Sequence, residues 1–181
     1  MAVNVLGIDL SLTCTGLAFV QDGRVEWTQT IKSTGKKGDT LRQRETRIYD
    51  IVNQIRGVTE RWEPALAVIE SPSFGSVHGS AHDRSGLWWG TVRALFRRHI
   101  AVAQVSPMQR AKYGTGKGNS AKGAVHMEVK ETYGRDDLPI FTNDEADAVL
   151  LAAMGARHFG EIVEEYLTDM HLAAMDKVVW P

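Results

Sequence analysis

The feature that most constrains the fold is residues 65–70, ALAVIE, an apolar run that ends in a carboxylate and is followed at once by Ser71 and Pro72. A strand with one solvated face alternates polar and apolar residues, whereas a strand buried on both faces is apolar almost throughout. This run lacks the alternation. It is therefore predicted to be a central strand of a sheet that is covered on both sides.

Four further segments predict the rest of the sheet. Residues 3–10 and 15–20 are short apolar runs, and residues 24–31 alternate polar and apolar side chains. Together these three segments indicate an antiparallel meander. Residues 100–105, IAVAQV, are a second candidate for a buried strand. Five strands are therefore expected.

The remaining segments carry helical signals, such as the helical period of apolar residues in 41–62 and a capping residue at Asn143. Helices are expected at residues 41–62, 81–98, 106–113, 120–133, 143–158 and 161–175. Three strands followed by alternating helices and strands predict an α/β fold. In it, a mixed five-stranded sheet, antiparallel in its first three strands, is flanked by helices.

Charge is distributed unevenly along the chain. The 181 residues have a formal net charge of −1, which by itself would argue against binding to a nucleic-acid backbone. However, residues 84–122 contain eight Lys or Arg and no acid, whereas residues 123–181 contain twelve acids and four bases. The basic segment is suited to following phosphates while acids elsewhere hold cations, although a solvated surface is the alternative.

The N-terminal sequence MAVNVLGIDL has no basic segment, long apolar run or small-residue cleavage site, and no stretch of the chain has the apolar length of a membrane span. A cytoplasmic protein without membrane contact is therefore expected. Cys14 is the single cysteine, so it cannot form an internal disulfide. We expect it to be a small core residue.

Four acids lie where the predicted elements can hold a carboxylate rigidly. Asp9 lies at the end of the first strand, where forming a turn is its alternative role. Glu70 ends the buried strand, where a carboxylate is costly unless it is paired, hydrogen-bonded or bound to metal. Asp144 and Asp147 project from one face of their predicted helix, with complementing the helix dipole as the alternative, whereas Glu145 points about 100° away.

These acids offer only oxygen ligands, and no pair of cysteines or closely spaced histidines suits a softer metal. Mg²⁺ or Mn²⁺ is the expected ion. Clustered carboxylates repel one another unless divalent cations compensate their charge. Two such ions about 4 Å apart can flank a phosphodiester, so hydrolysis of phosphodiesters is the expected reaction.

Three motifs resemble the RuvC family of Holliday junction resolvases, which has the RNase H-like fold. LGIDLSLTCTGLAFV resembles the first hairpin of the family, VIESP its second acidic strand and NDEADAVLLAAMGARH its closing helix. The match extends over about residues 3–158. It implies a metal-dependent, structure-selective endodeoxyribonuclease that cleaves Holliday junctions or other branched DNA with two Mg²⁺ ions, for which Mn²⁺ substitutes. The catalytic, metal-binding positions that it implies are Asp9, Glu70, Asp144 and Asp147.

A fourth motif, VSPMQRAKYGTGKGNSAK, resembles the family's Gly-rich, Lys-bearing loop beside the active site. This resemblance implies that Lys112 and Lys122 bind DNA phosphates, with Lys117 as a secondary candidate, whereas solvated surface lysines are the alternative. Phe74 lies near the place where the family offers an aromatic side chain to stack at the centre of a junction. Packing of Phe74 on its own loop is the alternative.

Symmetric cutting of a four-way junction needs two active sites, so the resemblance also implies a C2 homodimer bound to branched DNA, with forks and flaps as further substrates. The helix at residues 81–98 is the candidate interface, and Trp88 and Trp89 are expected in the core or at that interface. A nuclease domain is expected over residues 1–160, with a C-terminal helical extension of the same domain over residues 161–181.

The first hairpin and the fold are also compatible with two other functions. ATP phosphotransferases of the actin-like or sugar-kinase type also begin with a Gly-Ile-Asp hairpin, but they need two copies of this fold, and the chain shows no repeat of the hairpin. A non-catalytic module that only binds junctions would keep the fold and lose the chemistry. The presence of all four acids argues against such a decayed site.

Overall fold

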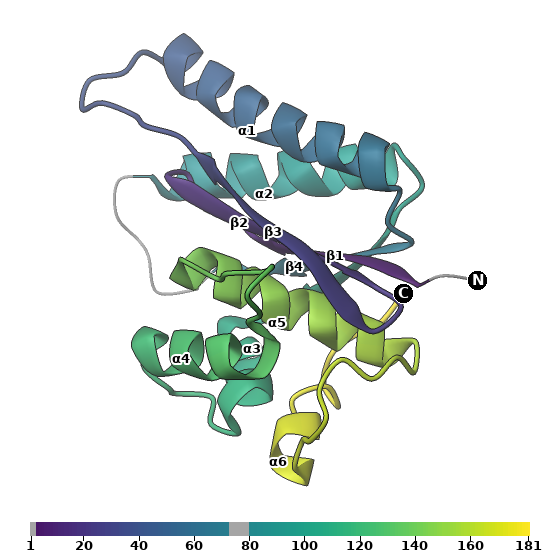
Figure 1. The fold of residues 1–181 in the computed structure, drawn as a ribbon. Coiled ribbons are helices and arrows are strands. Elements are labelled where there is room, and N and C mark those ends of the chain that lie inside the picture. The colour runs from purple at the N-terminus through teal and green to yellow at the C-terminus, as the bar shows by residue number, and fades with distance from the viewer. Residues whose placement is uncertain (1–2, 73–79) are drawn as a thin grey trace.

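The computed structural model describes residues 3–72 and 80–181, and it contains one mixed sheet (Figure 1). Its order across the sheet is β3-β2-β1-β4-β5. The strands β1, β2 and β3 pair in antiparallel fashion, whereas β4 runs parallel to both β1 and β5. The predicted five-stranded sheet is confirmed. The strands are β1 (Asn4–Asp9), β2 (Cys14–Gln21), β3 (Arg24–Lys32), β4 (Leu66–Glu70) and β5 (Ala101–Val105).

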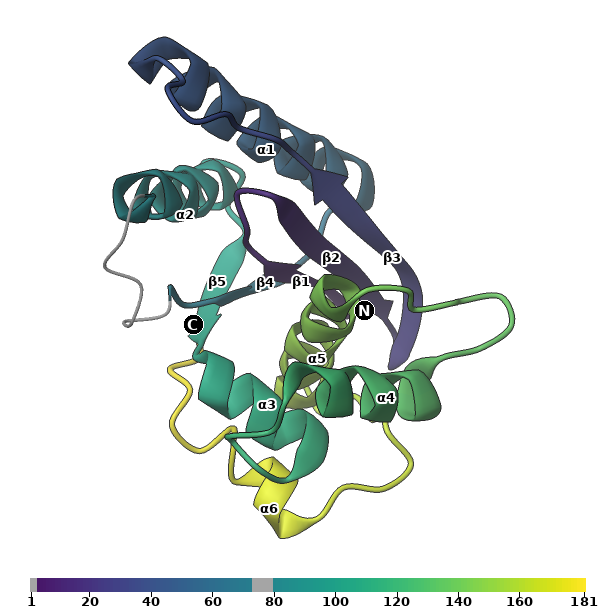
Figure 2. The same cartoon turned by 90° about the vertical axis from the view of Figure 1, so that its left-hand side faces the viewer.

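Helices cover both faces of the sheet (Figures 1 and 2). On one face lie α1 (Leu41–Trp62) and α2 (Ala81–Phe96), and on the other lie α3 (Pro107–Thr115), α4 (Lys122–Tyr133), α5 (Asn143–His158) and α6 (Asp169–Leu172). Each face of the sheet has its own hydrophobic core, because successive residues of a strand point to opposite faces. Leu6 and Ile8 pack with α1 and α2, whereas Val5 packs with α5. Among the helices of residues 3–72 and 80–181, none has the length and apolarity to cross a membrane.

The strand β4 is the central element that its sequence predicts. Its first four residues, Leu66 to Ile69, have no exposed surface. They pair with β1 on one side and with β5 on the other, and Glu70 pairs with Val105 at the end of the β5 ladder. The apolar run is therefore buried from both faces and both edges, and only its last residue reaches the rim of the sheet.

The helix α5 lies directly on β1 and β2 because glycines face it. A Cβ atom at Gly7 would lie 2.0 Å from the carbonyl oxygen of Ala148, and one at Gly16 would lie 1.9 Å from that of Asp144. Real Cβ atoms do not approach backbone so closely. Since Gly16 also pairs with Asp9 across the β1–β2 ladder, this contact fixes the start of α5 beside the end of β1.

The prediction of a helix over residues 161–175 is wrong, because only Asp169–Leu172 of that segment is helical. Side-chain hydrogen bonds to Glu164 hold residues 161–175 in place. Glu164 is 2% exposed and accepts hydrogen bonds from the hydroxyls of Tyr113, at 2.7 Å, and Tyr133, at 2.5 Å. Arg157 donates to its other carboxylate oxygen at 2.6 Å. These bonds draw the chain against α3, α4 and α5 in an irregular path.

The glycine contact under α5 predicts a local sensitivity to added volume. Gly16→Ala should lower the melting temperature by roughly 5–10 °C, because overpacking against backbone costs about 1–3 kcal/mol. Gly57→Ala is the matched control, since a Cβ atom at this site in α1 meets nothing within 4 Å and alanine favours a helix. Calorimetry on both variants checks this. A Gly16→Ala protein as stable as the wild type would contradict the contact.

Candidate active site

Strand alternation directs two of the predicted acids toward α5. Val5 and Gly7 of β1 face that helix, and Asp9 follows in the same alternation. Val68 of β4 faces the same core, and Glu70 follows it. Because β1 and β4 are parallel neighbours, both carboxylates reach the same edge of the sheet.

The first two turns of α5 bring the other two acids to this edge. The expected cap at Asn143 is wrong by one residue: Thr142 caps the helix, and its side chain accepts a hydrogen bond from the backbone N–H of Glu145 at 3.1 Å. Asp147 is buried, with a side chain that is 5% exposed, whereas Asp144 is half-buried. The carboxylate of Glu145 is turned away and accepts hydrogen bonds from the backbone of Phe141 and Thr142, both at 2.9 Å. The charges of Glu70, Asp147 and Asp144 all act on Asp9, so the four predicted site acids lie near one another at this edge. Glu145 serves the helix cap.

The neighbouring acids make it unfavourable for the carboxyl group of Asp9 to ionise. Burial, together with the charges of Glu70 and Asp147, raises the pKa of Asp9 well above its ordinary value. The edge of the sheet is thus a site that gains from any cation placed among the acids.

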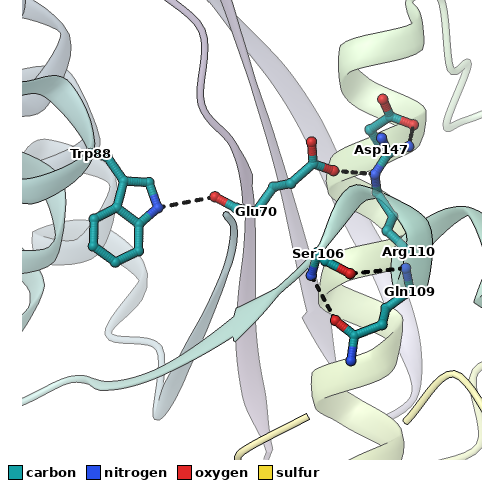
Figure 3. A network of polar contacts seen from close by, with 6 residues as sticks. All are labelled: Glu70, Trp88, Ser106, Gln109, Arg110 and Asp147. Carbon is teal, nitrogen blue, oxygen red and sulfur yellow. Dashed lines mark hydrogen bonds and ion pairs between the residues drawn. The ribbon is translucent and has the colours of Figure 1, made fainter. Parts of the chain in front are cut away.

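One such cation belongs to the protein itself (Figure 3). The guanidinium of Arg110 donates to a carboxylate oxygen of Glu70 through Nε and to one of Asp147 through Nη1. The side chains are 8% exposed for Arg110, 15% for Glu70 and 5% for Asp147. Burying an arginine is costly unless it is paired and hydrogen-bonded, and the two carboxylates meet this requirement.

The position of Arg110 is set by both ends of α3. Ser106 and Gln109 form a reciprocal capping box directly after β5, with bonds of 3.2 and 2.9 Å (Figure 3). One turn past Arg110, Tyr113 is buried and donates its hydroxyl to Glu164. Arg110 therefore projects from a helix that is held at its start and at its end.

Arg110 is not among the site residues that the sequence predicts, because it lies within the basic segment of residues 84–122. The sequence of α3 nevertheless indicates that Arg110 is directed toward the core. Positions 107, 110, 111 and 114 share one helical face, and there Ala111 is buried while Gly114 approaches Leu150 of α5. An arginine on a face that is directed at the core needs a buried anionic partner, which the nearby acids supply.

The residues that are predicted to bind DNA lie outside the acid cluster or outside the described part of the chain. Lys112 is half-buried on α3, and Lys117 is exposed in the loop after it, where its backbone N–H donates to the hydroxyl of Thr115 at 3.3 Å. Lys122 is the first residue of α4. Phe74 lies outside the described residues.

Cys14 and two tryptophans complete the surroundings. The expectation that Cys14 is a core residue is wrong: it is half-buried at the start of β2, where burial and a hydrogen bond to Asp144 raise the pKa of its thiol to about 11. The indole of Trp88 donates to the backbone carbonyl of Glu70 at 3.0 Å (Figure 3). Both residues line a pocket of about 120 Å³. Trp89 is 63% exposed, so of the two it is Trp88 that packs against the core.

The donor set fits a hard divalent cation, because carboxylate oxygens are the ligands that Mg²⁺ and Mn²⁺ prefer. Within residues 3–72 and 80–181, no three His, Cys, Asp or Glu side chains form a ready-made metal site. Arg110 engages Glu70 and Asp147 in this conformation. The ligand chemistry is therefore present, and two of the four acids are paired with a cation of the protein.

Comparison with known proteins connects this geometry to a family. The family model of the crossover junction endodeoxyribonuclease RuvC matches residues 5–154. The RuvC of Methylobacillus flagellatus is 29% identical over 180 aligned residues, which cover 90% of this chain and 93% of that protein.

Solved structures of the Thermus thermophilus RuvC share the fold. One has a TM-score of 0.68 at 22% identity and covers 89% of this chain and 98% of its own. A second, of the same protein in complex with a Holliday junction substrate, has a TM-score of 0.68 at 21% identity and covers 88% and 97%. The family model's range, residues 5–154, includes β4, residues 5–9 of β1 and residues 143–154 of α5, and therefore all four acids.

The repulsion at Asp9 predicts that removing its charge stabilises the metal-free protein. In EDTA at neutral pH, Asp9→Asn should raise the melting temperature by about 2–4 °C, or about 1 kcal/mol. A folded-state pKa above the unfolded value opposes folding once the carboxyl ionises, so the gain should vanish below about pH 4, where Asp9 is protonated in both states. Thermal unfolding across pH measures this.

The control for this measurement is Asp50→Asn, at an exposed position of α1, which should change the melting temperature little. An Asp9→Asn protein that is less stable than the wild type in EDTA would contradict the repulsion.

Proposed function

This chain belongs to the RuvC family of crossover junction endodeoxyribonucleases, and we propose that it hydrolyses phosphodiester bonds in four-way DNA junctions at its cluster of four acids. The observation that carries the proposal is the placement of four acids at one edge of the sheet. Asp9 and Glu70 end neighbouring parallel strands, Arg110 joins Glu70 to Asp147, and the charge of Asp144 acts on Asp9. All four lie inside the segment that the family model matches. Enzymes of this family are metal-dependent. We propose Mg²⁺ as the ion, with Mn²⁺ as a substitute and two ions in each site.

The chain's own residues give the site its rigidity. Asp9 and Glu70 end neighbouring parallel strands, and Asp147 lies on a helix that touches those strands through glycine, so the ligand oxygens are held by backbone rather than by a loop. Divalent ions bound there supply activation of water and charge compensation at the leaving oxygen. Asp147 is buried, whereas Asp9, Glu70 and Asp144 are each half-buried, so three of the four acids retain some access to solvent.

Phosphate contacts are assigned to the segment that follows β5. We propose that Lys112, Lys117 and Lys122 bind the DNA backbone around the cut and that Phe74 stacks on a base at the junction. Lys117 is exposed, and the hydrogen bonds of Thr115 shape the loop that carries it. The Thermus thermophilus relative is solved with a Holliday junction substrate, and the same class of DNA is the proposed partner here, with forks and flaps as further candidates.

The helix α2 is the proposed surface for a C2 homodimer, which would present two active sites to one junction. Trp89 is 63% and Phe96 57% exposed on this helix. With Val92, Arg93 and Arg97 they line an open hollow of about 480 Å³. Exposed aromatic side chains flanked by arginines are typical of the central residues of an interface.

Cleavage of labelled substrates in Mg²⁺ tests the proposed activity. We expect paired nicks in a four-way junction, with a linear duplex of the same sequence uncut. Asp9→Asn and Asp144→Asn should each slow cutting by at least about 100-fold, because they remove groups that act at the transition state. Both variants should still shift the junction in a gel, and chelation by EDTA should abolish cutting.

The control for the cleavage assay is Asp50→Asn, which should cut like the wild type. Equal cutting of junction and duplex would contradict structure selectivity. An Asp9→Asn protein that cuts at the wild-type rate would show that the site lies elsewhere.

The dimer surface gives a separate prediction. Trp89→Asp should weaken dimerisation by about 2 kcal/mol or more, roughly 30-fold in the dissociation constant, because tryptophans at the centre of interfaces contribute this much. Sedimentation velocity over a concentration series measures the change. Tyr166→Asp, at a position that is 81% exposed and far from α2 in the chain, is the control. A Trp89→Asp protein with unchanged dimerisation would place the interface elsewhere.

A further inference from the structure

Arg110 bonds the same carboxylates that the proposed function assigns to the metal. Its two contacts are to Oε2 of Glu70 and Oδ1 of Asp147, and all three side chains are largely buried. The capping box at Ser106 and the bond from Tyr113 to Glu164 hold α3 in place, so the fold itself delivers the guanidinium to this position. An exposed arginine that happened to fold over an acidic surface would lack both supports.

A guanidinium and a divalent cation cannot share these oxygens at close range. Both are positive, and in a site shielded from water their repulsion is much stronger than in solution. A carboxylate oxygen that accepts a hydrogen bond from a guanidinium also has fewer lone pairs to offer an ion. Arg110 and the metal therefore compete for Oε2 of Glu70 and Oδ1 of Asp147.

A phosphate group of the DNA can accept hydrogen bonds from the guanidinium once it has left the carboxylates. Arginine presents a planar fork of donors that matches phosphate oxygens in the same bidentate manner as carboxylates. A phosphodiester bound over the acid cluster would bring such oxygens to the site from which Arg110 departs. An exchange of partners would then leave no buried charge unpaired: the guanidinium passes from carboxylate to phosphate, and the carboxylates pass from guanidinium to metal.

We propose that Arg110 is a built-in competitor of the divalent cation, which blocks two of the four ligands in the free protein and gives them up when the phosphate group of DNA arrives. This inference rests on the proposed function, since it assumes that the acids bind metal. Its consequence is a coupling between two ligands. Because binding free energies are linked reciprocally, DNA should tighten metal binding by the same factor by which metal tightens DNA binding.

Mn²⁺ binding, followed by the electron paramagnetic resonance signal of the free ion, tests the proposal without any cutting. Samples are the wild type and Arg110→Gln, each alone and with an uncleavable four-way junction that carries phosphorothioate linkages at the cut sites. The wild type alone should bind Mn²⁺ weakly, and the junction should tighten binding by about 5- to 150-fold, the usual range of such couplings. Arg110→Gln alone should bind Mn²⁺ at least about 5-fold more tightly than the wild type, with little further effect of the junction.

Two additional variants control for folding and charge. Arg157→Gln removes an arginine from another ion pair, with Glu164, and should leave Mn²⁺ affinity at the wild-type value. Arg110→Lys keeps the charge but has a single donor group, so it should give an intermediate affinity and serves if Arg110→Gln does not fold. Thermal melting in EDTA establishes that each protein is folded.

Asp144→Asn distinguishes failure of the proposed metal site from failure of the competition by Arg110. The described contacts of Arg110 are to Glu70 and Asp147 and do not include Asp144. If Asp144→Asn leaves Mn²⁺ binding intact in both backgrounds, the acids are not the metal site and the proposed function itself fails. If Asp144→Asn weakens binding while Arg110→Gln binds Mn²⁺ no more tightly than the wild type, the metal site stands and the competition is overturned. Weaker binding by Arg110→Gln would make Arg110 a positioning residue that holds the ligands ready.

Discussion

The close contact between α5 and the β1–β2 hairpin is the constraint on which the site depends. Gly7 and Gly16 offer no side chain, so the backbone of α5 rests on the sheet where any larger residue would collide with a carbonyl oxygen. Residues 145–156 of the helix are consequently all buried. The same contact brings the first turn of α5 to Asp9, which pairs with Gly16 across the ladder. The fold thus gathers carboxylates from three elements without using a flexible loop.

Gathering these acids creates an electrostatic problem that the protein solves with Arg110. Burial, together with the charges of Glu70 and Asp147, raises the pKa of Asp9, and the cluster favours any cation that can enter it. In the free chain the buried guanidinium binds Glu70 and Asp147. This internal cation makes the close arrangement of acids compatible with a stable fold.

Much of this arrangement could be predicted from local sequence. The run ALAVIE indicated a buried strand that ends in a carboxylate, and the spacing of Asp144 and Asp147 placed both on one helical face. The irregular path after Gly160 could not be predicted, because it depends on bonds from Tyr113, Tyr133 and Arg157 to Glu164, whose partners are distant in the chain. Arg110 was missed for the same reason. Its neighbours in sequence suggest a phosphate-binding surface, whereas its partners come from β4 and α5.

The central claim is that the meeting point of β1, β4 and α5 is a metal site whose ligands Arg110 holds in the free protein. A crystal structure of the protein bound to Mn²⁺ and an uncleavable junction, with the ions located by their anomalous scattering, tests it most directly. The account predicts Mn²⁺ between Asp9, Glu70, Asp144 and Asp147, with the guanidinium of Arg110 on a DNA phosphate. Mn²⁺ located away from these acids, or Arg110 still bridging Glu70 and Asp147 beside a fully loaded site, would contradict it.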